Sequence, residues 1–161
     1  MSSTIVPTHT PADILAQALI DGEVLTDGGT WSVTVGFLLD DSDVAAVYDT
    51  VGRKDGRHMY KSGASSDVTG RTVEHPGFQI RVRGVTQNSA QEKLKDVSEY
   101  LDTIRQQTIW IGSSVYHLVA VSKTSTALSL GRTEETRFHE FTLNGTMTIT
   151  LSAATTTTSS P

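Results

Sequence analysis

The sequence predicts an α+β fold: a mixed, largely antiparallel sheet with two helices packed on one face. Three observations lead to this prediction. Apolar residues recur at helical spacing in only two segments, whereas several segments alternate between apolar and polar residues as strands do. The helices do not follow each strand in turn, as a doubly wound parallel sheet would require. A length of 161 residues suits one domain.

The first helix is predicted over Pro11–Ile20. Thr10 can cap its first turn, proline suits the first helical position because its missing N–H needs no partner there, and Asp13 places an acid near the helix start. The apolar stripe of this helix consists of Ile14, Leu15, Ala18 and Leu19. Residues 1–9 are expected to form a flexible N-terminus, so that the single domain covers residues 10–151.

Two strands are predicted next. Apolar and polar residues alternate over Trp31–Leu39, which indicates a strand with one buried face. Three acidic residues, Asp40, Asp41 and Asp43, interrupt this pattern. The short apolar segment Val44–Tyr48 then predicts the second strand.

A Gly-rich arm is predicted at residues 50–75. Between Thr50 and His75 the chain contains no Phe, Leu, Ile or Trp, but it has four glycines and five Lys or Arg residues. Such a segment cannot build a core of its own, and connections longer than about 12 to 15 residues in compact domains are usually functional or disordered. We expect the arm to reach a neighbouring molecule and to become ordered there.

The strand predicted over Phe78–Val82 has one apolar and one basic face, and Gly84 ends it. A second helix follows, beginning with a capping box made by Ser89 and Glu92. Its apolar stripe consists of Ala90, Leu94, Val97, Leu101 and Ile104.

The last part of the domain is predicted to be β structure. Thr108–Ile111 and Val115–Val121 form strands joined by a turn at Gly112-Ser113-Ser114, and a longer β segment covers Arg137–Leu151. Within it, Asn144-Gly145 indicates either a hairpin turn or a bulge in one long strand; we slightly prefer the bulge. Residues 152–161 have no apolar side chains to bury beyond alanine and are expected to be a disordered tail.

Composition excludes several classes of protein. The net charge of −5 disfavours a nucleic-acid binder that relies on a general excess of positive charge. The absence of cysteine excludes disulfides, thiolate nucleophiles and cysteine-bound metals. No apolar run approaches the roughly 18 residues that a membrane span needs, and no secretory signal is recognisable, so we expect synthesis in the cytoplasm.

No catalytic, metal-binding or cofactor-binding residues are predicted, and we expect no enzymatic activity. His139-Glu140 begins like a zinc-protease motif, but Leu143 stands where the second histidine is needed. Lys61-Ser62 lacks the glycine that precedes the lysine of a phosphate-binding loop. Gly112-Ser113-Ser114 lacks the second glycine of a nucleophile elbow.

The remaining candidate is a basic surface. Guanidinium groups present a planar fork of donors that suits carboxylates and phosphates. The basic strand face is either simply solvated or contacts an acidic surface on another subunit. The candidate subunit or partner interface comprises Arg53, Lys54, Arg57, His58, Lys61, Arg71, Gln79, Arg81 and Arg83.

The run His75–Gly84, with an amphipathic helix shortly after it, resembles the central signature of bacteriophage tail terminator proteins, which are often labelled minor capsid proteins. The resemblance extends to Ile14–Leu19, to Val44–Thr50 before the arm, and to Arg137–Asn144. It covers most of the chain, from about Asp13 to Leu151. The order and separation of the four pieces carry the resemblance more than any one of them.

The resemblance implies a structural virion protein of the tail and neck, with an α+β fold and no catalysis or cofactor. Such proteins form a homo-hexameric ring on the head-proximal end of a long non-contractile tail. The implied partners are further copies of the chain, the tail tube protein, and the head-tail connector or stopper protein. DNA would pass through the ring without specific binding.

Two alternatives remain open. Another small ring-forming neck component, such as a stopper or tail completion protein, belongs to the same structural class. A cytoplasmic ligand-binding domain or small enzyme that uses the arm as a lid belongs to a different one.

Overall fold

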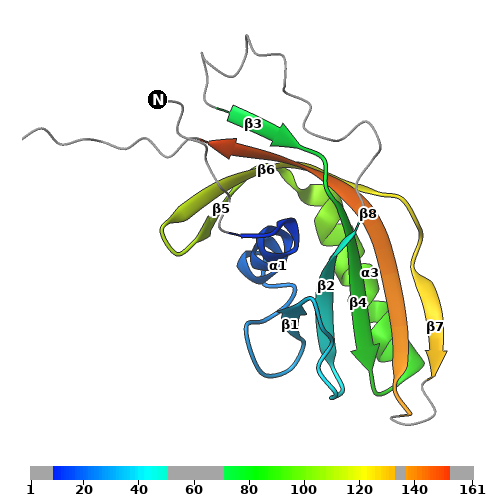
Figure 1. Ribbon diagram of the computed structural model, residues 1–161. Coiled ribbons are helices and arrows are strands. Elements are labelled where there is room, and N and C mark those ends of the chain that lie inside the picture. Colours follow the sequence, from blue (N-terminus) through cyan, green and yellow to red (C-terminus); the bar gives the residue numbers. More distant parts are fainter. Residues whose placement is uncertain (1–8, 51–70, 133–136, 153–161) are drawn as a thin grey trace, which may run out of the picture.

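A computed structural model describes residues 9–50, 71–132 and 137–152. These residues form an α+β fold in which two helices accompany a mostly antiparallel, curled sheet (Figure 1). The predicted fold class is therefore confirmed. The elements are α1 (Pro11–Asp21), β1 (Ser32–Val35), β2 (Val44–Thr50), β3 (Arg71–Glu74), β4 (Gly77–Gly84), α3 (Gln87–Thr103), β5 (Arg105–Ile111), β6 (Ser114–Lys123), β7 (Leu128–Arg132) and β8 (His139–Ser152).

The long strand β8 is the central strand of the sheet and pairs with four of the other described strands. On one side it pairs with β4 and then β3, and on the other with β7 and then β6, all antiparallel. The β3 and β4 pairings keep one register, from Arg71 opposite Ser152 to Gly84 opposite His139, across the break at His75-Pro76. β2 extends the sheet beyond β4, and β1 adds to β2 as the parallel pair.

Both helices pack on the inner, concave face of the curl (Figure 1). Phe78, Ile80 and Val82 of β4 point into this core and are fully buried. The helices also contact each other, because the Tyr100 hydroxyl of α3 donates a hydrogen bond to the Ala18 carbonyl of α1 over 3.1 Å. The outer face of the sheet is therefore covered by neither helix.

The predicted start of the first helix is confirmed. Thr10 caps α1 in a capping box: the Asp13 amide donates to the Thr10 hydroxyl oxygen over 3.3 Å, and the Thr10 amide donates to the Asp13 carboxylate over 2.9 Å. The cap predicted for the second helix is wrong. Thr86 is the cap of α3, and Ser89 occupies the third helical position that we assigned to Glu92.

The early start of α3 has a packing reason. Gly84 lies so close to the helix that a Cβ there would approach the Ser89 hydroxyl to 2.7 Å and the Ala90 amide nitrogen to 2.9 Å. The helix must therefore begin almost directly after β4, which makes Thr86 the residue in capping position.

Thr86→Ala is expected to lower the free energy of unfolding by about 1 kcal/mol, because it removes the acceptor for a helix amide. Glu92→Ala is the matched control. Since Glu92 makes no capping contact, its replacement should leave the denaturation midpoint within the scatter of the wild type. Urea denaturation measures both effects. An equal loss of stability in the two variants would mean that Glu92 contributes to the helix cap, as the sequence predicted.

The strand predicted over Trp31–Leu39 is shortened to β1. Positive φ angles at Trp31 (60°) and Gly36 (81°) turn the backbone out of the strand at both ends. As a consequence Phe37 is 56% exposed and Leu39 is 38% exposed, instead of facing the core.

β8 is one continuous strand through Asn144-Gly145, so the hairpin alternative is wrong. The preferred bulge is wrong as well, since the pairing with β4 keeps its register across this pair. Gly145 is required for close packing: a Cβ there would lie 2.5 Å from Cζ of Phe78 and 2.6 Å from the Ser122 carbonyl oxygen. The irregularities lie in the partner strands β6 and β7 instead.

Several predicted boundaries change. The predicted arm at 50–75 contains β3, since Arg71–Glu74 pairs with β8, and residues 51–70 lie outside the described residues. β7 was not predicted. His9, assigned to the flexible N-terminus 1–9, hydrogen-bonds through Nδ1 to the Tyr116 hydroxyl over 2.7 Å, and Ser152, assigned to the disordered tail 152–161, ends β8. Residues 1–8 and 153–161 lie outside the described residues.

Neither helix in the described ranges has the length and apolarity needed to cross a membrane.

Candidate interface site

The candidate site lies on the outer face of the sheet. Gln79, Arg81 and Arg83 alternate with the buried apolar residues of β4, as predicted, and so point away from the helices. Directly paired residues of neighbouring strands share a face. The register therefore places Tyr48 and Asn144 on either side of Gln79.

Arg83 is engaged within its own chain. Its Nε and one terminal nitrogen donate to the same oxygen of Glu140, over 2.9 and 2.7 Å, and its other terminal nitrogen donates to the Leu39 carbonyl over 2.9 Å. Asp40 adds a longer contact of 3.6 Å. The side chains of Arg83 and Glu140 are only 12% and 10% exposed. This arginine is a structural residue, and its assignment to a partner interface is not supported by its contacts.

Arg81, on the same face, is held in place but not saturated. Its Nε donates to the Gln79 side-chain oxygen over 2.9 Å, and the Gln79 amide nitrogen donates to the Asn144 side-chain oxygen over 3.0 Å. The guanidinium carbon lies 5.3 Å from the centre of the Tyr48 ring, a cation–π contact. Within the described residues, nothing accepts a hydrogen bond from its two terminal nitrogens.

The two arginines therefore differ in what they offer. The donors of Arg83 already bind the Glu140 carboxylate and the Leu39 carbonyl. Arg81, by contrast, presents its two terminal nitrogens in a fixed orientation. A planar fork of this kind suits a carboxylate or phosphate that approaches the sheet from outside. The ordering of Arg81 by Gln79 and Tyr48 lowers the conformational entropy that such binding would cost.

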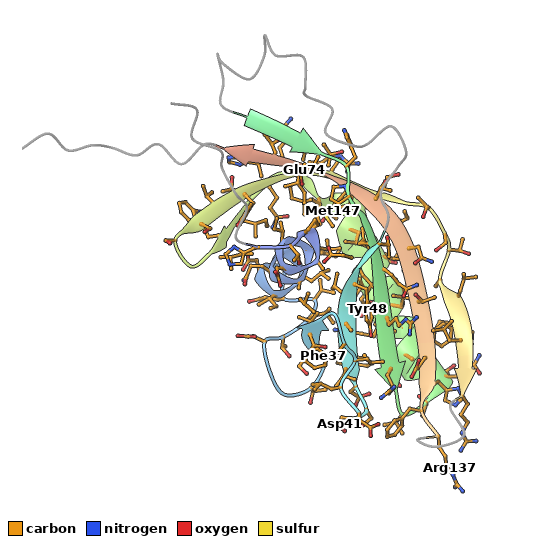
Figure 2. The ribbon with its side chains drawn as sticks, viewed as in Figure 1. Phe37, Asp41, Tyr48, Glu74, Arg137 and Met147 are labelled. Atoms are coloured by element: carbon orange, nitrogen blue, oxygen red, sulfur yellow. The ribbon has the colours of Figure 1, made fainter. Side chains whose placement is uncertain are left out.

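An exposed apolar side chain is aligned with Arg81 on this face. Leu128 of β7 is 48% exposed and is aligned with Arg81 through Thr142, which pairs with both. Phe37, which is also exposed, lies in the segment after the edge strand β1 (Figure 2). The Leu39 contact to Arg83 brings the same segment over this face. Arginines are enriched in interaction surfaces, where they lie beside apolar side chains.

The structure unites only part of the predicted set. Gln79, Arg81 and Arg83 share one face. The backbone of Arg71 pairs with Ser152, far along β8 from Arg81. The remaining predicted residues lie outside the described residues: Arg53, Lys54, Arg57, His58 and Lys61.

Sequence reasoning missed the residues that order this face. Tyr48 and Asn144 fix the orientation of Arg81, and Glu140 neutralises Arg83. Each of them belongs to another strand, so its contact with β4 follows only from the strand register. The alternation around Tyr48 was a usable signal, since it places this ring on the face opposite the core residue Val47.

Shallow hollows among the described residues lie elsewhere. One of about 300 Å³ is lined by Gln106, His117, Val119 and Thr150, and one of about 460 Å³ lies beside Lys123. The Lys123 amine donates to the Asp102 carboxylate and the Ser98 hydroxyl, each over 2.8 Å, so its charge is already compensated. Among the described residues, no group of three or more His, Cys, Asp or Glu could hold a metal ion.

No protein-family model matches this sequence, and no curated protein matches it. The class of site is therefore defined by its geometry alone. Among the residues that the structure describes, it is a sheet face with an ordered arginine whose terminal nitrogens have no acceptor, beside the exposed Leu128.

Proposed function

We propose that this chain is a structural virion protein that forms a ring on the head-proximal end of a phage tail tube. The ring ends tube polymerisation and provides the joining surface for the head connector or stopper protein. Its copies contact one another, the tail tube protein and the connector. The packaged DNA passes through the ring without specific binding, in keeping with a net charge of −5.

One observation carries the proposal. Three of the segments that resemble tail terminators are far apart in the sequence, and they fold into three adjacent strands: Val44–Thr50 is β2, His75–Gly84 contains β4, and Arg137–Asn144 contains the first half of β8. The fourth, Ile14–Leu19, lies in α1 and packs against β2. The resemblance thus describes one spatial unit, with Arg81 on its outer face.

The surface chemistry supports a role in assembly. The ordered arginine and the exposed apolar side chains are suited to contacts between rigid bodies, for which no backbone rearrangement is needed. Contacts between two different surfaces of identical copies close into a ring when the rotation per copy fits. One ring surface would continue the last layer of the tube, and the other would not accept a further layer, so growth stops.

The proposal predicts the phenotype of a phage in which this gene is inactivated. Tail tubes should then grow beyond their normal length, because nothing caps the growing end. Electron microscopy of the particles measures the tube lengths, and expression of the wild-type chain from a plasmid should restore them. Tails of normal length together with heads that leak DNA would contradict the terminator role and identify a stopper instead.

A further inference from the structure

A second charged surface lies on α3, on the other side of the molecule from Arg81. Glu92 and Asp96 are both exposed and stand four residues apart, so they are neighbours on the helix. The described residues provide neither with an ion pair. Like charges at this spacing destabilise a helix by a few tenths of a kcal/mol, unless a cation compensates them.

The cations near this pair already have partners. Lys95 forms an ion pair with Glu99 at 3.8 Å, and Lys93 lies over the Trp31 ring at 5.7 Å. The two helices together hold six acidic and two basic residues: Asp13, Asp21, Glu92, Asp96, Glu99 and Asp102 against Lys93 and Lys95. The helix layer is therefore acidic, whereas the outer face of β4, on the opposite side of the sheet, presents Arg81.

These two surfaces cannot meet within one copy. The buried stripe of α3, which includes Leu94 and Val97, faces the inner side of the sheet, so Glu92 and Asp96 point away from the sheet. Arg81 points out of the opposite side of the sheet. An outer sheet face and an outer helix face can join only between copies, and such a contact repeats head to tail.

Building on the proposed function, we infer that Arg81 of one copy binds Glu92 and Asp96 of the next copy in the ring. The two terminal nitrogens of Arg81 supply donors for the carboxylates, and Gln79 and Tyr48 hold the guanidinium ready. The exposed Leu128, aligned with Arg81 through Thr142, reduces the access of water to the contact, which weakens its screening by salt. The occupant of this sheet face is thus a second copy of the same chain.

A charge-exchange experiment tests the pairing. The full-length chain is studied as Arg81→Glu, as the double variant Glu92→Arg/Asp96→Arg, and as the combination of all three substitutions. At concentrations where the wild type forms rings, the first two proteins should associate at least about tenfold more weakly, because each brings like charges together. The triple variant should regain the ring, since the signs are exchanged. Sedimentation velocity measures the particle size.

Arg105→Glu is the matched control, since it makes the same charge change at an exposed position at the start of β5. It should leave the ring intact. Circular dichroism checks that every variant is folded. Should Arg81→Glu fail to fold, Arg81→Gln removes the charge without adding a carboxylate and should still weaken the ring.

The other outcomes contradict the inference in distinguishable ways. Rings that persist in both charge variants while tail attachment is lost would assign this face to the tube or connector protein and leave the proposed function standing. A triple variant that stays dissociated although each parent variant is folded would show that these residues do not pair. A wild type that forms no ring at any concentration would contradict the proposed function itself.

Discussion

Gly145→Ala is expected to destabilise the protein by about 2 to 4 kcal/mol, the range of severe overpacking and of displaced backbone in a core. The added Cβ would lie 2.5 Å from Cζ of Phe78 and 2.6 Å from the carbonyl oxygen of Ser122. The ring of Phe78 is fully buried, and the Ser122 carbonyl belongs to the backbone of β6. The strain therefore falls on both neighbours of β8.

Chemical denaturation of the purified chain measures this effect. Gly28→Ala is the matched control, because Gly28 has no heavy atom within 4 Å of the position of a Cβ and no positive φ. Its stability should stay within about 0.5 kcal/mol of the wild type. If Gly145→Ala were as stable as Gly28→Ala, the continuous register of β8 between β4 and β6 would be incorrect.

Glu140→Ala is the second substitution with a large expected effect, a loss of about 3 to 5 kcal/mol. It leaves the guanidinium of Arg83, whose side chain is only 12% exposed, without its main counter-charge. Asp40 cannot replace Glu140, because its side chain is 85% exposed and lies 3.6 Å from Arg83. The lost free energy of unfolding comes from leaving a largely buried charge uncompensated. It does not equal the net contribution of the ion pair to stability.

Two further variants separate these contributions. The double variant Arg83→Met/Glu140→Leu removes both charges and should recover most of the lost stability, since apolar replacement of a buried pair is often close to neutral. Asp40→Asn should change the denaturation midpoint very little, as its contact is solvated. A double variant no more stable than Glu140→Ala would mean that packing, and not charge, is what Glu140 contributes.

Local patterns in the sequence predicted the elements whose faces differ sharply. The alternation in β4 and the apolar stripe of α3 both report which side is buried, and the structure buries those sides. β7 could not be found in this way. All five of its residues are exposed, so the sequence shows no alternation between buried and exposed positions. The strand forms because its backbone pairs with β8.

The prediction of a turn or bulge from residue type was wrong at a position where close packing requires the glycine. Asn144-Gly145 reads as a turn or bulge because both residues tolerate positive φ angles. Here the glycine is needed for the close approach of Phe78 and Ser122, and the strand runs straight through.

The candidate site was predictable only in part, for a related reason. Alternation along β4 was enough to place Gln79, Arg81 and Arg83 on one outward face. It could not distinguish the arginines, because the partner of Arg83 is Glu140, 57 residues away, and their meeting depends on the register of β4 and β8. Only with that register does Arg81 emerge as the unsaturated cation.

The proposal that copies of this chain assemble into a ring is tested most directly by the mass of the particle that the full-length chain forms in solution. Native mass spectrometry from micromolar to submillimolar concentration should find a closed assembly of six copies, with no continuous series of larger aggregates. A single-chain mass at every concentration would contradict a ring-forming building block. The outer face of the sheet would then have no second copy of the chain to bind.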